Sequence, residues 1–189
     1  MNIEYIKNFN LAISRTKKHN LLDKSMTSLC YSQSLLTDSI ATKIMDEFSG
    51  TFKSWSDEDF VGQCLKSHVL FLPKVENILG EKVTFTIGYI ESKEQNYFKF
   101  SEGNAEDWMS RGMPKNTANI HAWLTLPSSE IIDLTFLPTF AKINEMKVPK
   151  GSMIADYSSH LDGMKYIPMF IGVGFLHKIG ALKFEVRYE

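Results

Sequence analysis

In one segment of the sequence, residues 119–136, side chains assigned to an apolar face alternate regularly with side chains assigned to a polar face. This alternation predicts a β-hairpin in a defined register. If residues 127–129 (Pro-Ser-Ser) form a three-residue turn, Trp123 faces Asp133 across the two strands. Residues that pair across antiparallel strands share a face, and successive residues alternate between faces. A two-residue turn would shift the pairing by one residue and bring core residues into line with polar ones. The hydrophobic pattern therefore favours the turn of odd length.

This register divides the hairpin into an apolar core face and a polar face with an ionisable pair. The apolar face, with Glu130 near water at the turn, consists of Ile120, Ala122, Leu124, Leu126, Glu130, Ile132, Leu134 and Phe136. The polar face consists of His121, Trp123, Thr125, Ile131, Asp133 and Thr135. Asp133 lies diagonal to His121, and diagonal neighbours are about 7–8 Å apart at the backbone, within reach of two polar side chains. A carboxylate that orients a histidine is what the general base of a nucleophile needs.

The chain has two cysteines, Cys30 and Cys64, and either could supply a nucleophile. A thiol reacts as the thiolate, which a protonated histidine or a helix N-terminus favours. A helix predicted to begin near Ser56, an N-cap residue, would carry Cys64 in its third turn, or Gly62 could break it and let a new helix begin there. Cys64 directly precedes the strand region, so its helix can pack on that sheet, whereas Cys30 fits a buried small hydrophobe. We therefore expect Cys64 to be the nucleophile.

An acyl-transfer site also needs hydrogen-bond donors for the developing oxyanion. The backbone amide of Cys64 and the side chain or amide of Gln63 are the predicted donors. Trp55 and Trp108 also carry indole donors, but core packing is the better interpretation of both.

The sequence predicts an α+β fold in which N-terminal helices pack on an antiparallel sheet, in a single domain covering residues 1–189. Ile3, Ile6, Phe9 and Ile13 mark the apolar face of a first helix. A second helix is expected from about Ser34 to Phe48, ended by Ser49-Gly50. We expect Pro73 to kink or end the third helix.

The second half of the chain predicts strands. Alternation over residues 83–89 and 182–188 indicates one strand each, and the hairpin lies between them. The polar excursion over residues 91–119 is long for a structureless loop. It is interpreted either as carrying a short helix that shapes a substrate entrance or as a mobile surface insertion. The apolar stretch from Tyr166 to Leu176 indicates a buried strand or loop.

Composition excludes several classes of protein. The chain has 43% hydrophobic and 23% charged residues, which is ordinary for a globular protein. Its formal net charge of −1 lacks the positive excess typical of nucleic-acid-binding proteins, so no nucleic-acid partner is expected. No apolar run reaches the length of a membrane span, so no membrane partner is expected. The N-terminus lacks a signal-peptide pattern, which predicts a cytoplasmic protein and leaves leaderless secretion open. Two cysteines without a CxxC motif argue against a disulfide framework and a structural zinc site. No cofactor is expected. The oligomeric state stays open.

Three short motifs together carry a resemblance to a known family. They are Gly62-Gln63-Cys64, His121-Ala122-Trp123 and Ile132-Asp133-Leu134-Thr135. In this order the chain resembles the transglutaminase-like superfamily of papain-type cysteine enzymes, over roughly residues 56–136, although Leu65 stands where that family usually has Trp. The short hairpin is similar to that of bacterial transglutaminase-like peptidases, including leader peptidases of lasso-peptide biosynthesis.

The resemblance implies a papain-like core and a set of residue roles. Cys64 would be the nucleophile, His121 the general base and acid, and Asp133 the residue that orients the imidazole. Gln63 and Trp123 would contribute to the oxyanion or substrate-binding site. The implied activity is hydrolysis or acyl transfer at an amide bond of a peptide or protein, through a thioester.

Two other interpretations compete with this one. The chain could keep such a fold as a catalytically inactive binding module. His121, Asp133 and His160 could instead hold a metal ion, although their spacing matches no familiar ligand pattern. The remaining histidines, His19, His68 and His177, are expected to be surface or structural residues.

Overall fold

The computed structural model of the chain describes residues 3–22, 29, 33–114, 119–149 and 151–182, and their fold is mixed α+β. The helices are α1 (Ile3–Lys18), α2 (Asp38–Thr51), α3 (Asp57–Phe60), α4 (Cys64–Leu79), α5 (Glu102–Arg111), α6 (Phe136–Ile143), the 3-10 helix η1 (Ser158–His160) and α7 (Gly174–Lys178). The strands are β1 (Thr84–Ser92), β2 (Asn96–Tyr97), β3 (His121–Thr125), β4 (Glu130–Asp133), β5 (Ile154–Tyr157) and β6 (Met164–Ile171). The predicted fold class is confirmed.

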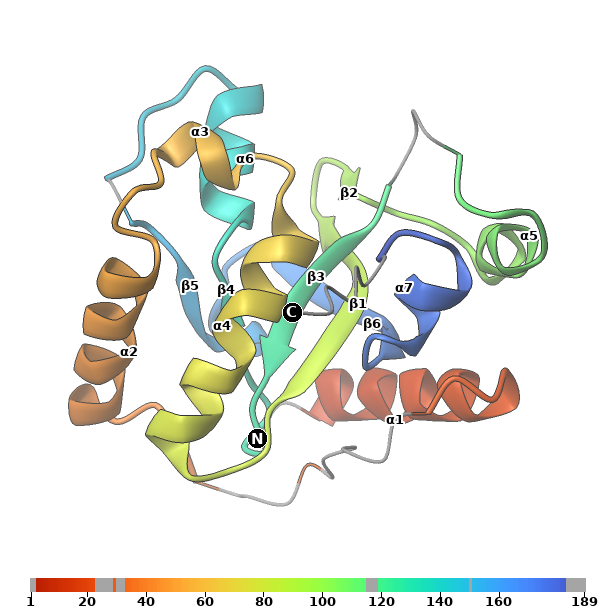
Figure 1. Cartoon of the computed structure of the whole chain (residues 1–189), viewed down its shortest axis with the longest axis horizontal. Coiled ribbons are helices and arrows are strands. Elements are labelled where there is room, and N and C mark those ends of the chain that lie inside the picture. The colour runs from red at the N-terminus through yellow and green to blue at the C-terminus, as the bar shows by residue number, and fades with distance from the viewer. Residues whose placement is uncertain (1–2, 23–28, 30–32, 115–118, 150, 183–189) are drawn as a thin grey trace, which may run out of the picture.

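The six strands form one sheet in which every neighbouring pair is antiparallel. The order is β2-β1-β3-β4-β5, and β6 pairs with β1, so that β1 and β3 lie near its centre (Figure 1). The β3–β4 hairpin pairs Leu124 with Ile132 and Thr125 with Ile131. This is the register that the three-residue turn predicts, and the Ser129 φ of 70° lies in that turn.

Both faces of the hairpin are buried, which corrects the expectation of a polar face. Side chains from α2, α4, α5 and α7 pack against one face, together with Ala122, Leu124 and Ile132. Tyr5 and Phe9 of α1 pack with Trp123, Ile131 and Tyr166 on the other. Figure 1 shows α4 crossing the sheet and α1 lying along a different side of it. The predicted apolar face is thus a core face, and a second core lies behind it.

Glu130 is buried rather than near water. Its carboxylate accepts hydrogen bonds from the amides of Leu35 (2.8 Å) and Leu36 (3.3 Å) and from the hydroxyls of Ser34 and Ser128. Two amides and two hydroxyls replace the water that the carboxylate loses. Glu130 thereby fixes the segment that precedes α2 onto the hairpin turn.

Several helix boundaries differ from those predicted. The helix α2 begins at Asp38 rather than Ser34, because Thr37 caps it, and it continues past Ser49-Gly50 to Thr51. The buried stripe of α1 is Tyr5, Phe9, Ala12 and Thr16, whereas Ile3 is exposed. Pro73 does not end α4, which continues to Leu79.

The excursion between β1 and β3 carries β2 and α5, as the interpretation with a short helix predicted. Cys30, which we interpreted as a buried small hydrophobe, lies outside the described residues. The strand predicted over residues 182–188 also lies outside them, except for its first residue. Among the described helices, none combines the length and the apolar character that crossing a membrane requires.

Candidate active site

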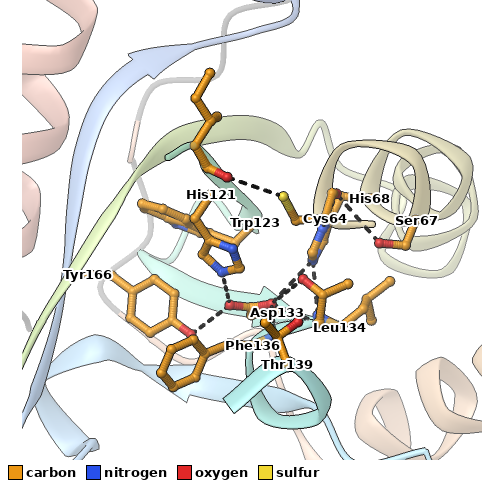
Figure 2. A network of polar contacts seen from close by, with 12 residues as sticks. Cys64, Ser67, His68, His121, Trp123, Asp133, Leu134, Phe136, Thr139 and Tyr166 are labelled. Atoms are coloured by element: carbon orange, nitrogen blue, oxygen red, sulfur yellow. Dashed lines mark hydrogen bonds and ion pairs between the residues drawn. The ribbon is translucent and has the colours of Figure 1, made fainter. Parts of the chain in front are cut away.

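The three predicted catalytic residues come from three element ends that meet at the open end of the hairpin. His121 is the first residue of β3 and Asp133 is the last residue of β4. Cys64 is the first residue of α4, because Gly62, with φ of 68°, ends the turn after α3 and lets a new helix begin. A left-handed φ favours glycine, so the break between the two helices is encoded locally. Figure 2 shows the thiol, the imidazole and the carboxylate grouped at this position.

His121 and Asp133 form a buried, hydrogen-bonded pair. His121 Nε2–H donates to Asp133 Oδ2 at 2.5 Å, and both side chains are almost fully buried. Burial alone would lower the pKa of His121, but the charge of Asp133, its hydrogen bond and contact with Cys64 together raise it above its ordinary value. The pair therefore favours an imidazolium held against a carboxylate, with Nδ1 as the remaining ring nitrogen.

The Asp133 carboxylate is held by more than the imidazole. Oδ1 accepts the backbone amides of Thr135 (2.9 Å) and Phe136 (3.0 Å), where α6 begins, and Oδ2 accepts the hydroxyl of Tyr166 (2.7 Å). Burial would raise the pKa of Asp133, yet His121 and these donors hold it well below its usual range. Asp133 is therefore a fixed negative charge throughout the physiological pH range.

The Cys64 thiol lies near the same imidazole (Figure 2). The presence of the thiol helps to raise the pKa of His121, and Sγ–H donates to the Ile120 carbonyl at 3.6 Å. The first amides of a helix have no partner within that helix, and its dipole favours an anion there. The N-terminus of α4 therefore offers what a thiolate and a developing oxyanion require.

The two predicted oxyanion or substrate-binding residues are placed differently. Gln63 is exposed at the N-cap position of α4, next to Cys64, and lines a cavity of 350 Å³ that Leu65 and Leu182 also line. Trp123 is fully buried, and its indole N–H donates to Tyr5 Oη at 2.8 Å on the α1 side. Its donor is therefore engaged in the core, which argues against the substrate-binding role predicted for it.

Two residues that the sequence reasoning did not assign to the site contact Asp133. Tyr166 of β6 donates to Oδ2, and His68 of α4 lies with Nε2 3.8 Å from Oδ1. His68 follows Cys64 by four residues, and residues spaced by four share a helix face, so this signal was readable in the sequence. No local pattern pointed to Tyr166, because its position depends on the pairing of β6 with β1.

A third residue, Phe98, covers the imidazole. Its ring stacks on that of His121 with centroids 4.8 Å apart and an interplanar angle of 15°. Phe98 has φ of 61°, which is strained for a bulky residue. The Phe98 side chain is partly exposed on one side and stacks on the imidazole on the other. It therefore lies between the imidazole and solvent.

The three predicted catalytic groups are nearly inaccessible to solvent. Exposure is 7% for Cys64, 1% for His121 and 0% for Asp133. Four cavities of the described chain are lined by residues other than these three, and the largest of the four, 480 Å³, lies between α1, β1 and β6. A substrate would therefore require a side chain such as that of Phe98 to move.

The metal interpretation finds no support in the geometry. His160 Nδ1–H donates to Asp156 Oδ1 at 2.9 Å, four residues earlier in the chain. Over the described ranges of the chain, no group of three or more histidine, cysteine, aspartate or glutamate residues could hold a metal ion.

Comparisons with protein-family models, with curated proteins and with solved structures found no match to this chain.

Proposed function

We propose that this chain is a cysteine hydrolase or acyltransferase that acts on an amide bond of a peptide or protein. Cys64 is the nucleophile, His121 the general base and acid, and Asp133 the residue that orients the imidazole. The observation that supports this most is the 2.5 Å bond from His121 Nε2 to Asp133 Oδ2, with the Cys64 thiol grouped beside this pair (Figure 2).

The chemistry follows from these positions. The Cys64 thiolate attacks the amide carbonyl carbon, and the new C–S bond yields an oxyanion that faces the first amides of α4. The C–N bond then breaks, and the protonated His121 gives its proton to the leaving amine. Water or an amine attacks the thioester, His121 takes the proton of this second nucleophile, and the thiolate leaves. These steps are the amide chemistry that the resemblance to transglutaminase-like enzymes implies.

A second function, a binding module without chemistry, is favoured by one observation. The three side chains are buried, and none of the described cavities is lined by them. In this case the Cys64 thiol would be a packing residue, and the bond between His121 and Asp133 would serve stability alone.

Thiol labelling separates the two functions. The full chain is treated with iodoacetamide between pH 6 and pH 8, and the labelled peptides are mapped, so that Cys30 serves as an internal reference for Cys64. A panel of thiol-reactive peptide and glutamine-mimic probes then tests whether labelling depends on the recognition elements of the probe.

An acyl-transfer enzyme labels rapidly at Cys64 near neutral pH, and Cys64→Ala abolishes that labelling and any amidase activity while leaving the fold intact. His121→Ala should slow the labelling of Cys64 strongly, because the thiolate loses its neighbour. Labelling at Cys30 with an inert Cys64, or labelling of Cys64 that ignores His121→Ala, would favour the binding module.

A further inference from the structure

His68 connects the segment that carries Cys64 to the segment that carries Asp133. Its Nδ1 lies 2.7 Å from the carbonyl oxygen of Cys64, and the amide of Leu134 donates to its Nε2 at 2.9 Å. Leu134 directly follows Asp133. One fully buried imidazole therefore connects the first turn of α4 to the end of β4 (Figure 2).

These two bonds fix the protonation state of His68. The Leu134 amide can only donate, so Nε2 must accept, and the Cys64 carbonyl can only accept, so Nδ1 must carry the proton. Burial lowers the pKa of His68 to about 4, against the opposing charge of Asp133. His68 is therefore neutral at physiological pH and leaves the negative charge of Asp133 to His121.

We propose that His68 is a positioning residue of the active site, which sets the place of the Cys64 sulfur against the imidazole of His121 by tying the Cys64 carbonyl to the Leu134 amide. This inference rests on the proposed function. It assigns no proton transfer to His68, because both ring nitrogens are already occupied. A misplacement of about 1 Å can cost about 100-fold in rate, so such a tether can matter as much as a group that touches the substrate.

Thr16 offers a matched control for this tether. Its hydroxyl donates to the Ala12 carbonyl four residues earlier at 2.7 Å and accepts the Ile171 amide at 3.1 Å. Like His68, Thr16 is fully buried and ties a helix carbonyl to the amide of a strand residue. It bridges α1 and β6, so Thr16→Val removes the same kind of connection without touching the nucleophile.

The experiment compares four full-length proteins that carry Cys30→Ser, so that Cys64 is the one remaining thiol. These are the parent, His68→Gln, His68→Leu and Thr16→Val. We measure the iodoacetamide rate at pH 7, well below the melting temperature of each protein, and the free energy of unfolding in urea. Glutamine can donate to the Cys64 carbonyl and accept the Leu134 amide, whereas leucine can do neither.

We expect His68→Leu to label about 10–100-fold more slowly than the parent and His68→Gln to label close to the parent rate. Thr16→Val should lose stability but keep the labelling rate. The inference is overturned if His68→Leu labels like the parent, if glutamine fails to rescue, or if Thr16→Val slows labelling as much as His68→Leu does.

A measurement on the parent protein keeps the test decisive if His68→Leu does not fold. The ¹⁵N chemical shifts of the His68 ring should show a protonated Nδ1 and an unprotonated Nε2 at pH 7, and the reverse tautomer would refute the tether. The substitution His121→Ala, made in the parent protein, tests the proposed function. If it leaves the labelling rate of Cys64 unchanged, both the proposed function and the role of His68 are refuted. If His121→Ala slows labelling and His68→Leu does not, the proposed function stands and only this inference fails.

Discussion

Acidification should destabilise the folded protein through His68, because this buried imidazole resists protonation. The pKa of His68 is about 4 in the folded protein against 6.5 as its ordinary value. A group with a lower pKa in the folded state binds fewer protons there than in the unfolded state, so its stabilising contribution is complete above pH 6.5 and is lost as the pH falls toward 4. The separation of 2.5 pH units, at 1.36 kcal/mol each, gives a loss of about 2 kcal/mol at pH 5 and about 3 kcal/mol at pH 4.

Urea unfolding followed by tryptophan fluorescence measures this loss, with His68→Gln as the reference. Glutamine keeps a donor and an acceptor but does not titrate, and every other ionisable group is the same in both proteins. The free energy of unfolding of the wild type, minus that of the variant, should fall by about 2 kcal/mol between pH 7 and pH 5. Parallel pH profiles for the two proteins would refute the assignment of His68 as a buried neutral imidazole.

Three further substitutions test other contacts of the site. Tyr166→Phe removes one donor from the buried carboxylate of Asp133 and should cost about 1–3 kcal/mol in urea unfolding, and an unchanged stability would contradict that hydrogen bond. Gly88→Ala should destabilise by more than about 3 kcal/mol or prevent folding, because its Cβ would lie 2.1 Å from the Ile167 carbonyl oxygen. Phe98→Ala should expose the imidazole beneath it and speed labelling of the thiol by bulky maleimides more than by iodoacetamide. Equal effects on the two reagents would show that Phe98 does not control access.

The hairpin and the pair on it could be predicted because they depend on local periodicity. The alternation of side chains allows one register that segregates the apolar residues, and that register also sets His121 beside Asp133. The break at Gly62 was one of two open alternatives, since a glycine in a helical pattern need not end the helix. Sequence patterns could not show that the polar face is covered, because α1 comes from a distant part of the chain.

The residues that the sequence reasoning missed depend on contacts between distant segments. Tyr166 reaches Asp133 only because β6 pairs with β1, and no alternation within one strand reveals its partner. Phe98 adopts a left-handed backbone that propensity disfavours for a bulky side chain, so no pattern would have placed it over His121. Glu130 was expected near water because turn ends usually are, yet the chain before α2 folds over it.

The docking of α1 on β6 has a consequence for the order in which this protein can mature. Thr16 of the first helix binds the backbone of Ile171, and Lys165 pairs with Glu4. The helix leaves the ribosome early, whereas the strand that receives it is among the last described segments to be synthesised. The same late strand supplies Tyr166 to the carboxylate of the site. A nascent chain therefore cannot complete the hydrogen bonds around the Asp133 carboxylate until translation has passed β6.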